Sequence, residues 1–161
     1  MESRPTVYSE TSIPSFYFEG RKQPEMVARR DWTRKWWDDR RQEYDLATSQ
    51  AVLDALARGD YPAKRDALAL MAGLRVLLVE PAVAEIVEVY VARGVMPRDP
   101  TGDALHLALA SYYGCAFLLT WNCAYLANAN KFRHIHRVNA LLGLSSPALV
   151  TPLELLGGDS P

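Results

Sequence analysis

The chain has 161 residues, 49% of them apolar, and its 18 lysines and arginines nearly balance 19 aspartates and glutamates. This length and composition predict one compact domain with a substantial core and exclude a largely disordered protein. The near-neutral charge argues against a cationic coat for nucleic acid, although a local basic face remains open. Two cysteines, Cys115 and Cys123, exclude a disulfide scaffold. Because the sequence also opens without a basic-then-apolar signal segment, we expect a cytoplasmic protein.

Short apolar runs alternate with amphipathic stretches along the chain. The apolar runs predict strands at residues 6–9, 46–49, 76–79, 117–120 and 149–151. The amphipathic stretches predict helices at residues 25–43, 50–58, 63–73, 82–93, 101–113 and 131–142. Strands separated by helices require crossover connections, so we expect a single α/β domain over residues 1–156 with a mostly parallel central sheet flanked by helices. Residues 157–161 are expected to form a disordered tail.

One stretch, residues 104–130, carries no formally charged residue and is therefore a candidate membrane span. It contains several polar residues, and its pattern changes from helix-like to strand-like at Gly114. A spanning helix needs about 20 predominantly apolar residues in one continuous pattern. The sequence therefore predicts no membrane segment.

Polar side chains follow several of the predicted strands, where a parallel sheet places its ligand site. Glu10 and Ser12 follow the first strand, and Thr120 and Asn122 lie at the end of the fourth. Their carboxylate, hydroxyl and amide oxygens suit a hard cation such as Mg²⁺ or Mn²⁺. Taken alone, Glu10 and its neighbours would equally serve as a helix or turn cap.

Asp103 is the second candidate acid, in the first turn of the predicted helix at residues 101–113. The helix macrodipole alone would favour an acid there. However, Leu107, Ala108 and Ser111 share its side of the helix, and a carboxylate that continues a buried face is costly unless a cation meets it. His106 follows three residues later and is either a phosphate ligand or a buried, hydrogen-bonded histidine.

Four segments, in this order, resemble the PIN-domain ribonucleases, the family that includes the VapC-type toxins. They are Val-Tyr-Ser-Glu-Thr-Ser-Ile-Pro at residues 7–14, Thr-Ser-Gln-Ala-Val-Leu-Asp-Ala-Leu at 48–56, Gly-Asp-Ala-Leu-His-Leu-Ala at 102–108 and Leu-Leu-Thr-Trp-Asn at 118–122. The resemblance implies a PIN-like three-layer fold and hydrolysis of RNA phosphodiester bonds with Mg²⁺ or Mn²⁺. The family's catalytic and metal-binding positions fall on Glu10, Asp103 and Asn122, with Ser12 and Thr120 in support. It also implies the toxin role in a type II toxin–antitoxin pair, a small antitoxin protein as partner, and a homodimer.

The sequence departs from the family pattern at the second acid, where the family places a glutamate and this chain has Ala55. Asp54 precedes it and is a weak substitute, because Val52, Leu53 and Leu56 define a buried helix face from which Asp54 points away. The alternative hypothesis is therefore a PIN-like RNA-binding module with little or no turnover.

Two basic clusters are candidates for RNA contact. The first is formed by Lys131, Arg133 and Arg137 and follows the Asn122 loop, which makes it the preferred surface; its alternative role is to keep a helix soluble. The second combines basic residues with an aromatic that could stack on a base: Arg30, Arg34, Trp37 and Arg41. Alternatively, this helix face is solvated and carries charge pairs such as Asp31 with Lys35. Trp32 and Trp36, at helical spacing, are then expected in the core.

Overall fold

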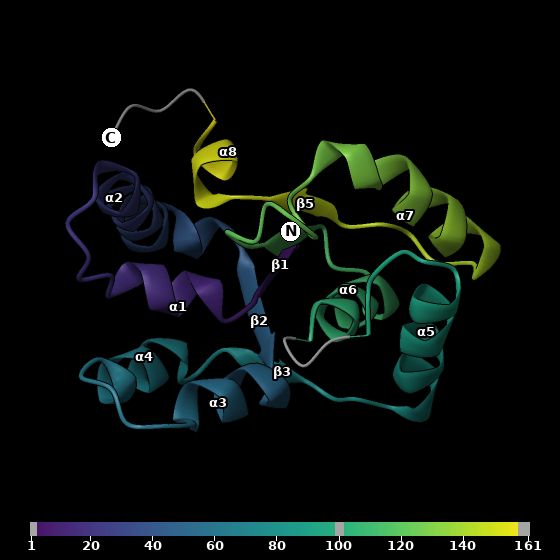
Figure 1. Ribbon diagram of the computed structural model, residues 1–161, viewed down its shortest axis with the longest axis horizontal. Coiled ribbons are helices and arrows are strands. Elements are labelled where there is room, and N and C mark those ends of the chain that lie inside the picture. The colour runs from purple at the N-terminus through teal and green to yellow at the C-terminus, as the bar shows by residue number, and fades with distance from the viewer. Residues whose placement is uncertain (1–2, 99–101, 158–161) are drawn as a thin grey trace.

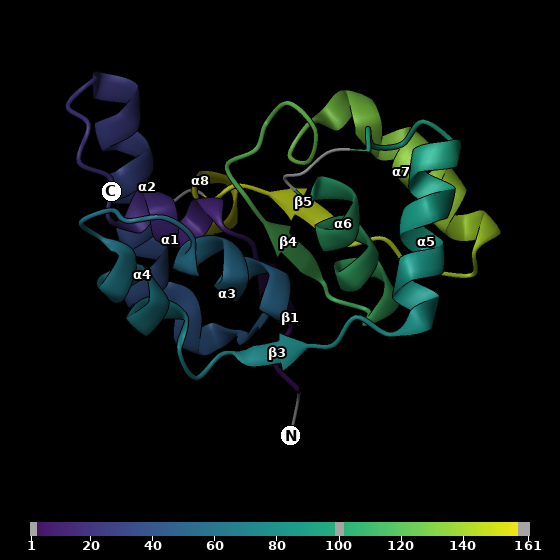
Figure 2. The ribbon, with the colours of Figure 1, turned by 60° about the horizontal axis from the view of Figure 1, so that its bottom comes forward.

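A five-stranded sheet, parallel throughout, forms the centre of the protein. The computed structural model describes residues 3–98 and 102–157. The strands are β1 (Thr6–Ser9), β2 (Asp45–Ser49), β3 (Arg75–Leu77), β4 (Phe117–Leu119) and β5 (Ala148–Val150). They lie in the order β3-β2-β1-β4-β5, so the first strand is central and β3 and β5 form the edges. Figure 2 labels both edge strands, with β4 between them. The α/β class and the parallel sheet expected from the sequence are confirmed.

Helices cover both faces of the sheet and make three layers (Figure 1). One layer contains α1 (Ser12–Tyr17), α2 (Pro24–Arg40), α3 (Gln50–Ala57), α4 (Lys64–Met71) and α8 (Pro152–Leu156). The other contains α5 (Pro81–Ala92), α6 (Asp103–Tyr112) and α7 (Ala129–Leu141), and a short 3₁₀ turn (Arg41–Glu43) follows α2. Within residues 3–98 and 102–157, no helix combines the length and apolarity that crossing a membrane requires.

The central strand is buried on both faces, as a parallel sheet covered by two helical layers requires. Val7 and Tyr8 are fully buried on β1. The Tyr8 hydroxyl lies 2.7 Å from Nδ1 of His106 on α6 and 2.8 Å from the Ser49 hydroxyl at the end of β2. Of the two interpretations of His106, the structure therefore supports the buried, hydrogen-bonded histidine.

Two short helices, α1 and α8, were not expected from the sequence. The sequence does contain a signal for α8, a capping box. The Thr151 side chain accepts the backbone N–H of Glu154, the Glu154 side chain accepts the backbone N–H of Thr151, and Pro152 lies in the first helical turn. The expected start of α6 at Thr101 lies outside the described residues. So does the expected tail at residues 157–161, apart from Gly157, which directly follows α8.

The expected aromatic and basic stripe on α2 is wrong in one respect, because Trp37 is only 2% exposed. Trp37 packs edge-on to Trp36 in the core, and the Arg41 guanidinium lies 5.0 Å from its ring centroid. It therefore presents no open ring to a base. The charge pairing also differs, since Lys35 pairs with Asp39 at 3.5 Å instead of with Asp31.

Candidate active site

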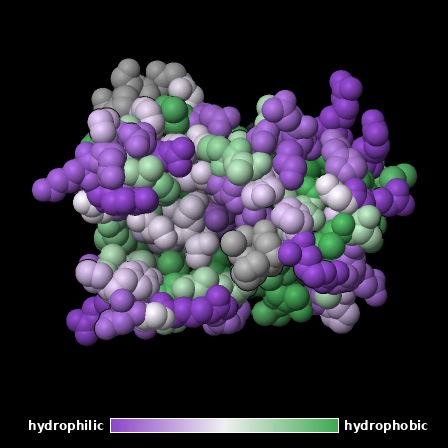
Figure 3. All heavy atoms as spheres, in the orientation of Figure 1, coloured by the Kyte–Doolittle hydropathy of each residue, from purple (hydrophilic) through white to green (hydrophobic). Residues whose placement is uncertain are grey.

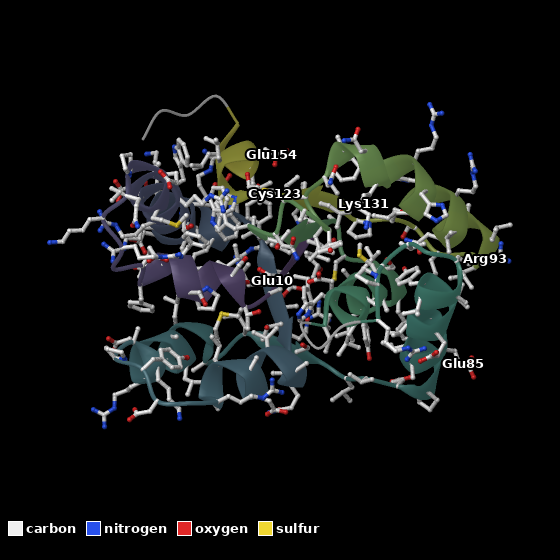
Figure 4. The ribbon with its side chains drawn as sticks, in the orientation of Figure 1. Glu10, Glu85, Arg93, Cys123, Lys131 and Glu154 are labelled. Atoms are coloured by element: carbon white, nitrogen blue, oxygen red, sulfur yellow. The ribbon has the colours of Figure 1, made fainter. Side chains whose placement is uncertain are left out.

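A pocket lies at the carboxyl ends of β1 and β4, between the two helical layers. Figure 4 shows Glu10 in the middle of the molecule, and the centre of the same face in Figure 3 is mixed in hydropathy, from purple to nearly white. The pocket has a volume of about 470 Å³ and combines acidic and hydroxyl side chains with one basic side chain and two aromatic rings. Its described lining residues are Glu10, Thr11, Ser12, Ser15, Phe16, Glu19, Arg21, Asp103, Asn122, Ala124 and Tyr125.

A second cavity, of about 510 Å³, lies at the opposite, amino-terminal edge of the sheet. Three arginines line it, Arg4, Arg41 and Arg75. The one carboxylate there, on Asp45, is already bonded to Arg75 at 2.8 Å and to the Thr6 hydroxyl at 3.2 Å. Because this second cavity lacks the converging acids of the first pocket, the pocket at the carboxyl edge is the candidate active site.

Glu10 is the residue directly after β1 and is 5% exposed. Burial raises the pKa of this carboxyl from 4.5 to about 7, against hydrogen bonds from Ser12 and Thr120 that favour the charged form. The negative charge of Asp103 raises the pKa further. The two acids, far apart in the sequence, therefore interact in one pocket.

Ser12 fastens Glu10 to the neighbouring strand. Its backbone N–H donates to Glu10 Oε1 at 2.9 Å, and its hydroxyl donates to the same oxygen. The Ser12 hydroxyl oxygen also accepts the backbone N–H of Trp121 at 2.8 Å, from the loop after β4. One hydroxyl thus ties the end of β1 to the end of β4 and fixes one carboxylate oxygen of Glu10.

Asp103 is the first residue of α6 and is 4% exposed. Gly102 before it has φ +85°, a left-handed conformation that side chains disfavour, and a Cβ there would lie 3.4 Å from His106 Nε2. This glycine lets the chain turn sharply into α6, so that its first residue stands in the pocket.

Asn122 holds Asp103 in place. Its Nδ2 group donates to Asp103 Oδ2 at 3.0 Å, while its Oδ1 accepts the backbone N–H groups of Ala124 and Tyr125 at 3.2 and 3.1 Å. The amide nitrogen, not the oxygen, therefore faces the acid. Thr120 completes the turn by accepting the backbone N–H of Asn122 at 2.9 Å.

The structure adds an ion pair to the pocket that the sequence analysis missed. Glu19 and Arg21 both line it, and their side chains bond through two N–H···O contacts of 2.7 and 2.9 Å. The Arg21 guanidinium lowers the pKa of Glu19 to about 2. The sequence signal was an acid and an arginine on either side of Gly20, which is too common a pattern to indicate a site.

Asp54 lies outside the pocket. It is exposed on α3, where it accepts a hydrogen bond of 2.9 Å from Gln50. Ala55 is half-buried, and neither residue belongs to the described lining. The structure thus groups Glu10, Ser12, Asp103 and Asn122 and leaves Asp54 apart.

The basic residues of α7 do not act as one patch. Lys131 donates to the backbone carbonyl of Val95 at 3.0 Å, and its ammonium lies 5.0 Å from the ring centroid of Tyr125, a pocket residue (Figure 4). Arg133 and Arg137 are exposed. At 100° per residue they occupy a different side of the helix from Lys131. Lys131 thus supports the pocket wall, whereas the two arginines face solvent.

The donor set of the pocket suits a hard cation with few protein ligands. Glu10 and Asp103 are two buried acids that repel each other, and a divalent cation would relieve that repulsion. Across the described parts of the chain, no three His, Cys, Asp or Glu side chains form a metal-binding group. Waters and substrate oxygens would have to complete the coordination of Mg²⁺, as they commonly do.

Comparisons with known proteins give no independent assignment. No family model, curated protein or solved structure matches this chain.

Proposed function

We propose that this protein is a PIN-like, divalent-metal-dependent ribonuclease that hydrolyses RNA phosphodiester bonds. The observation that carries the proposal is the convergence of Glu10 and Asp103, two buried carboxylates from distant parts of the chain, in one pocket at the carboxyl edge of the sheet. Burying two like charges is costly, and proteins that do so usually use them to bind a cation or to transfer protons.

Glu10 and Asp103 would hold Mg²⁺ or Mn²⁺ in the pocket that both residues line. The bound cation would supply charge stabilisation at the scissile phosphate and lower the pKa of a nucleophilic water. Ser12 and Thr120 favour the ionised form of Glu10 through their hydrogen bonds. Asn122 directs the Asp103 carboxylate by donating to one of its oxygens, and in this role it is a positioning residue instead of a metal ligand.

A second candidate function is an RNA-binding module with little turnover. It is favoured by Asp54, which is exposed and bonded to Gln50, so no acid from α3 joins the pocket. Loss of one carboxylate lowers the affinity for the cation, because hard cations are held mainly by charged oxygen ligands. The two candidates share the pocket and differ in whether two acids suffice for catalysis.

The toxin role is a finer proposal within the first function. A small antitoxin would inhibit the enzyme by placing a basic side chain against Glu10 and Asp103, where it would replace the cation. A homodimer is proposed on the same family resemblance.

Incubating the purified protein with a generic single-stranded RNA and Mn²⁺ tests the proposal. Cleavage that requires Mn²⁺ and is lost in both Glu10→Gln and Asp103→Asn supports the ribonuclease. Asp54→Asn is the matched control, because it makes the same change at an exposed acid outside the pocket. RNA bound by the wild type without cleavage would support the binding module, and cleavage that persists in Glu10→Gln would identify a contaminating nuclease.

A further inference from the structure

The ion pair between Glu19 and Arg21 lies on the wall of the candidate active site and is built asymmetrically. Only 10% of the Glu19 side chain is exposed, whereas 58% of the Arg21 side chain is. Both residues line the pocket that also contains Glu10 and Asp103. An inner carboxylate therefore holds an outer guanidinium at the pocket wall.

Three hydrogen bonds fix this arrangement. Arg21 Nε donates to Glu19 Oε1 at 2.7 Å and its Nη2 donates to Oε2 at 2.9 Å, which is the two-pronged geometry of an arginine–carboxylate pair. The backbone N–H of Arg21 also donates to Oε1, at 3.0 Å. The arginine is thus held by both its backbone and its side chain, which limits the rotamers that its guanidinium can occupy.

The pair leaves part of the guanidinium available for a second anion. A guanidinium carries five N–H donors, and Glu19 uses one at Nε and one at Nη2. The Nη1 group has no acceptor among the described residues. With 58% of the side chain exposed, these donors can reach an oxyanion that enters the pocket.

Two other arginines, Arg29 and Arg34, do not belong to the described lining of the pocket. Arg34 donates to the backbone carbonyl of Tyr17 at 2.7 Å. Arg29 lies against the rings of Phe16 and Trp121, 5.6 and 5.2 Å from their centroids. Among the described lining residues, Arg21 alone carries a positive charge in a pocket with three acids.

We propose that Arg21 binds a phosphate of the substrate next to the scissile bond, and that Glu19 is the positioning residue that aims it. The inference rests on the ribonuclease proposed above and adds a specific contact to that site. A phosphate entering a pocket that holds Glu10 and Asp103 meets electrostatic repulsion, and a guanidinium fixed in advance offsets it at little entropic cost.

The experiment measures binding of a short fluorescein-labelled oligouridine in EDTA, over a series of salt concentrations, so that no turnover interferes. The variants are Arg21→Gln, Arg21→Lys and Glu19→Gln. Lys22→Gln is the matched control, because it removes one positive charge from the next residue, which is outside the described lining. Thermal melting of each variant checks that the fold is retained.

We expect Arg21→Gln to weaken binding by about threefold to tenfold and to reduce the slope of log K against log salt by about 0.7, the value for one single-strand phosphate contact. Arg21→Lys should restore the slope but only part of the affinity, because an ammonium lacks the fork. Glu19→Gln should keep the slope and weaken binding, since the guanidinium stays charged but loses its orientation. Lys22→Gln should change affinity by less than about twofold.

Equal effects of Arg21→Gln and Lys22→Gln on affinity and slope would overturn the inference, as would a wild type that does not bind the oligonucleotide. Cleavage is measured separately with Mn²⁺. If the wild type cleaves RNA while Arg21→Gln binds it normally, the proposed phosphate contact of Arg21 is wrong and the ribonuclease proposal stands. If binding depends on Arg21 but neither the wild type nor any variant cleaves RNA, the phosphate contact stands and the protein is the RNA-binding module.

Discussion

Asn122 Nδ2 donates a hydrogen bond of 3.0 Å to Asp103 Oδ2 and thereby couples the loop after β4 to the first residue of α6. The other end of the same amide accepts two backbone N–H groups of its own loop. A single side chain therefore shapes the loop and aims the acid. Because the two tasks use different atoms, substitutions can separate them.

Asn122→Asp should keep the loop and change the site. An aspartate offers an oxygen to the same two backbone N–H groups but places a carboxylate oxygen, instead of a donor, against Asp103. We expect the variant to unfold at a lower temperature without metal, because like charges now face each other, and to bind Mn²⁺ more tightly than the wild type. Thermal melts with and without Mn²⁺ measure both effects.

Asn122→Ala is the companion variant and should lose both the hydrogen bond to Asp103 and the hydrogen bonds that shape the loop. Leaving the two backbone groups and the Asp103 oxygen without this partner should cost about 1–3 kcal/mol of unfolding free energy, with no gain in Mn²⁺ affinity. If the alanine and aspartate variants respond to Mn²⁺ alike, the hydrogen bond to Asp103 does not control the metal site.

Because burial raises the pKa of Glu10, we expect the free energy of unfolding to decline with rising pH when no metal is bound. Its pKa is about 7 in the folded protein and 4.5 in the absence of its surroundings, so the folded state holds an extra proton between these values. The free energy of unfolding should fall as pH rises from about 4.5 to 7, by roughly 3 kcal/mol, and this contribution should stay constant above that range. Urea unfolding in EDTA at pH 5 and pH 8 measures it.

Glu10→Gln cannot ionise, so its unfolding free energy should lack this part of the decline. Asp54→Asn, at an exposed acid, should retain it. Added Mn²⁺ should stabilise the wild type more at pH 8 than at pH 5, because only the ionised carboxylate binds the cation. A decline of equal size in Glu10→Gln and the wild type would show that another group titrates.

The sheet was predictable because each of its strands is a short apolar run between amphipathic stretches. Residues 6–9 form β1 with the expected bounds, and the other strands differ from expectation by one or two residues at their ends. The short helix α1 was not predicted, since six residues are too few for a helical period to stand out. Trp37 was misplaced because the side of α2 that packs on the sheet is set by tertiary contacts.

Glu10 and Asp103 line one pocket, and part of this arrangement could be predicted because parallel strands bring their carboxyl ends to one edge of the sheet. That argument places Glu10 and Asn122 together. Asp103 was a candidate because it continues the buried face of its helix, and the family resemblance then grouped all three residues. The Glu19–Arg21 pair could not be predicted, because it depends on how the chain after α1 returns to the pocket. The orientation of the Asn122 amide could not be predicted either, because it depends on the hydrogen bonds that its oxygen accepts from the backbone of its own turn.

Arg133 and Arg137 provide the test of the basic surface on α7. Changing both to glutamine should weaken RNA binding and reduce the salt slope by up to about 1.4, or about 0.7 for each single-strand phosphate contact. Lys131→Gln should differ from them, because this lysine bonds to Val95 and packs on Tyr125, so its loss should lower the melting temperature. If the slope falls only when Arg30 and Arg41 are changed, RNA follows α2 instead.

The missing second acid gives the most direct test of the family resemblance. Ala55 is half-buried on α3, at the position where the family resemblance implies a glutamate. We expect Ala55→Glu to tighten Mn²⁺ binding and to raise metal-dependent RNA cleavage above that of the wild type, because a third carboxylate adds charge to the cation site. Titration calorimetry and a cleavage assay measure the two effects.

Asp54→Asn is the control for that variant and should leave both quantities unchanged, because Asp54 is exposed and bonded to Gln50. The reverse pattern, with cleavage lost in Asp54→Asn and unaltered in Ala55→Glu, would make Asp54 the working ligand and would require α3 to turn toward the pocket. If neither the wild type nor Ala55→Glu cleaves RNA that both bind, adding the acid is not sufficient for turnover. The protein would then be the RNA-binding module, and its pocket would lack the chemistry that hydrolysis needs.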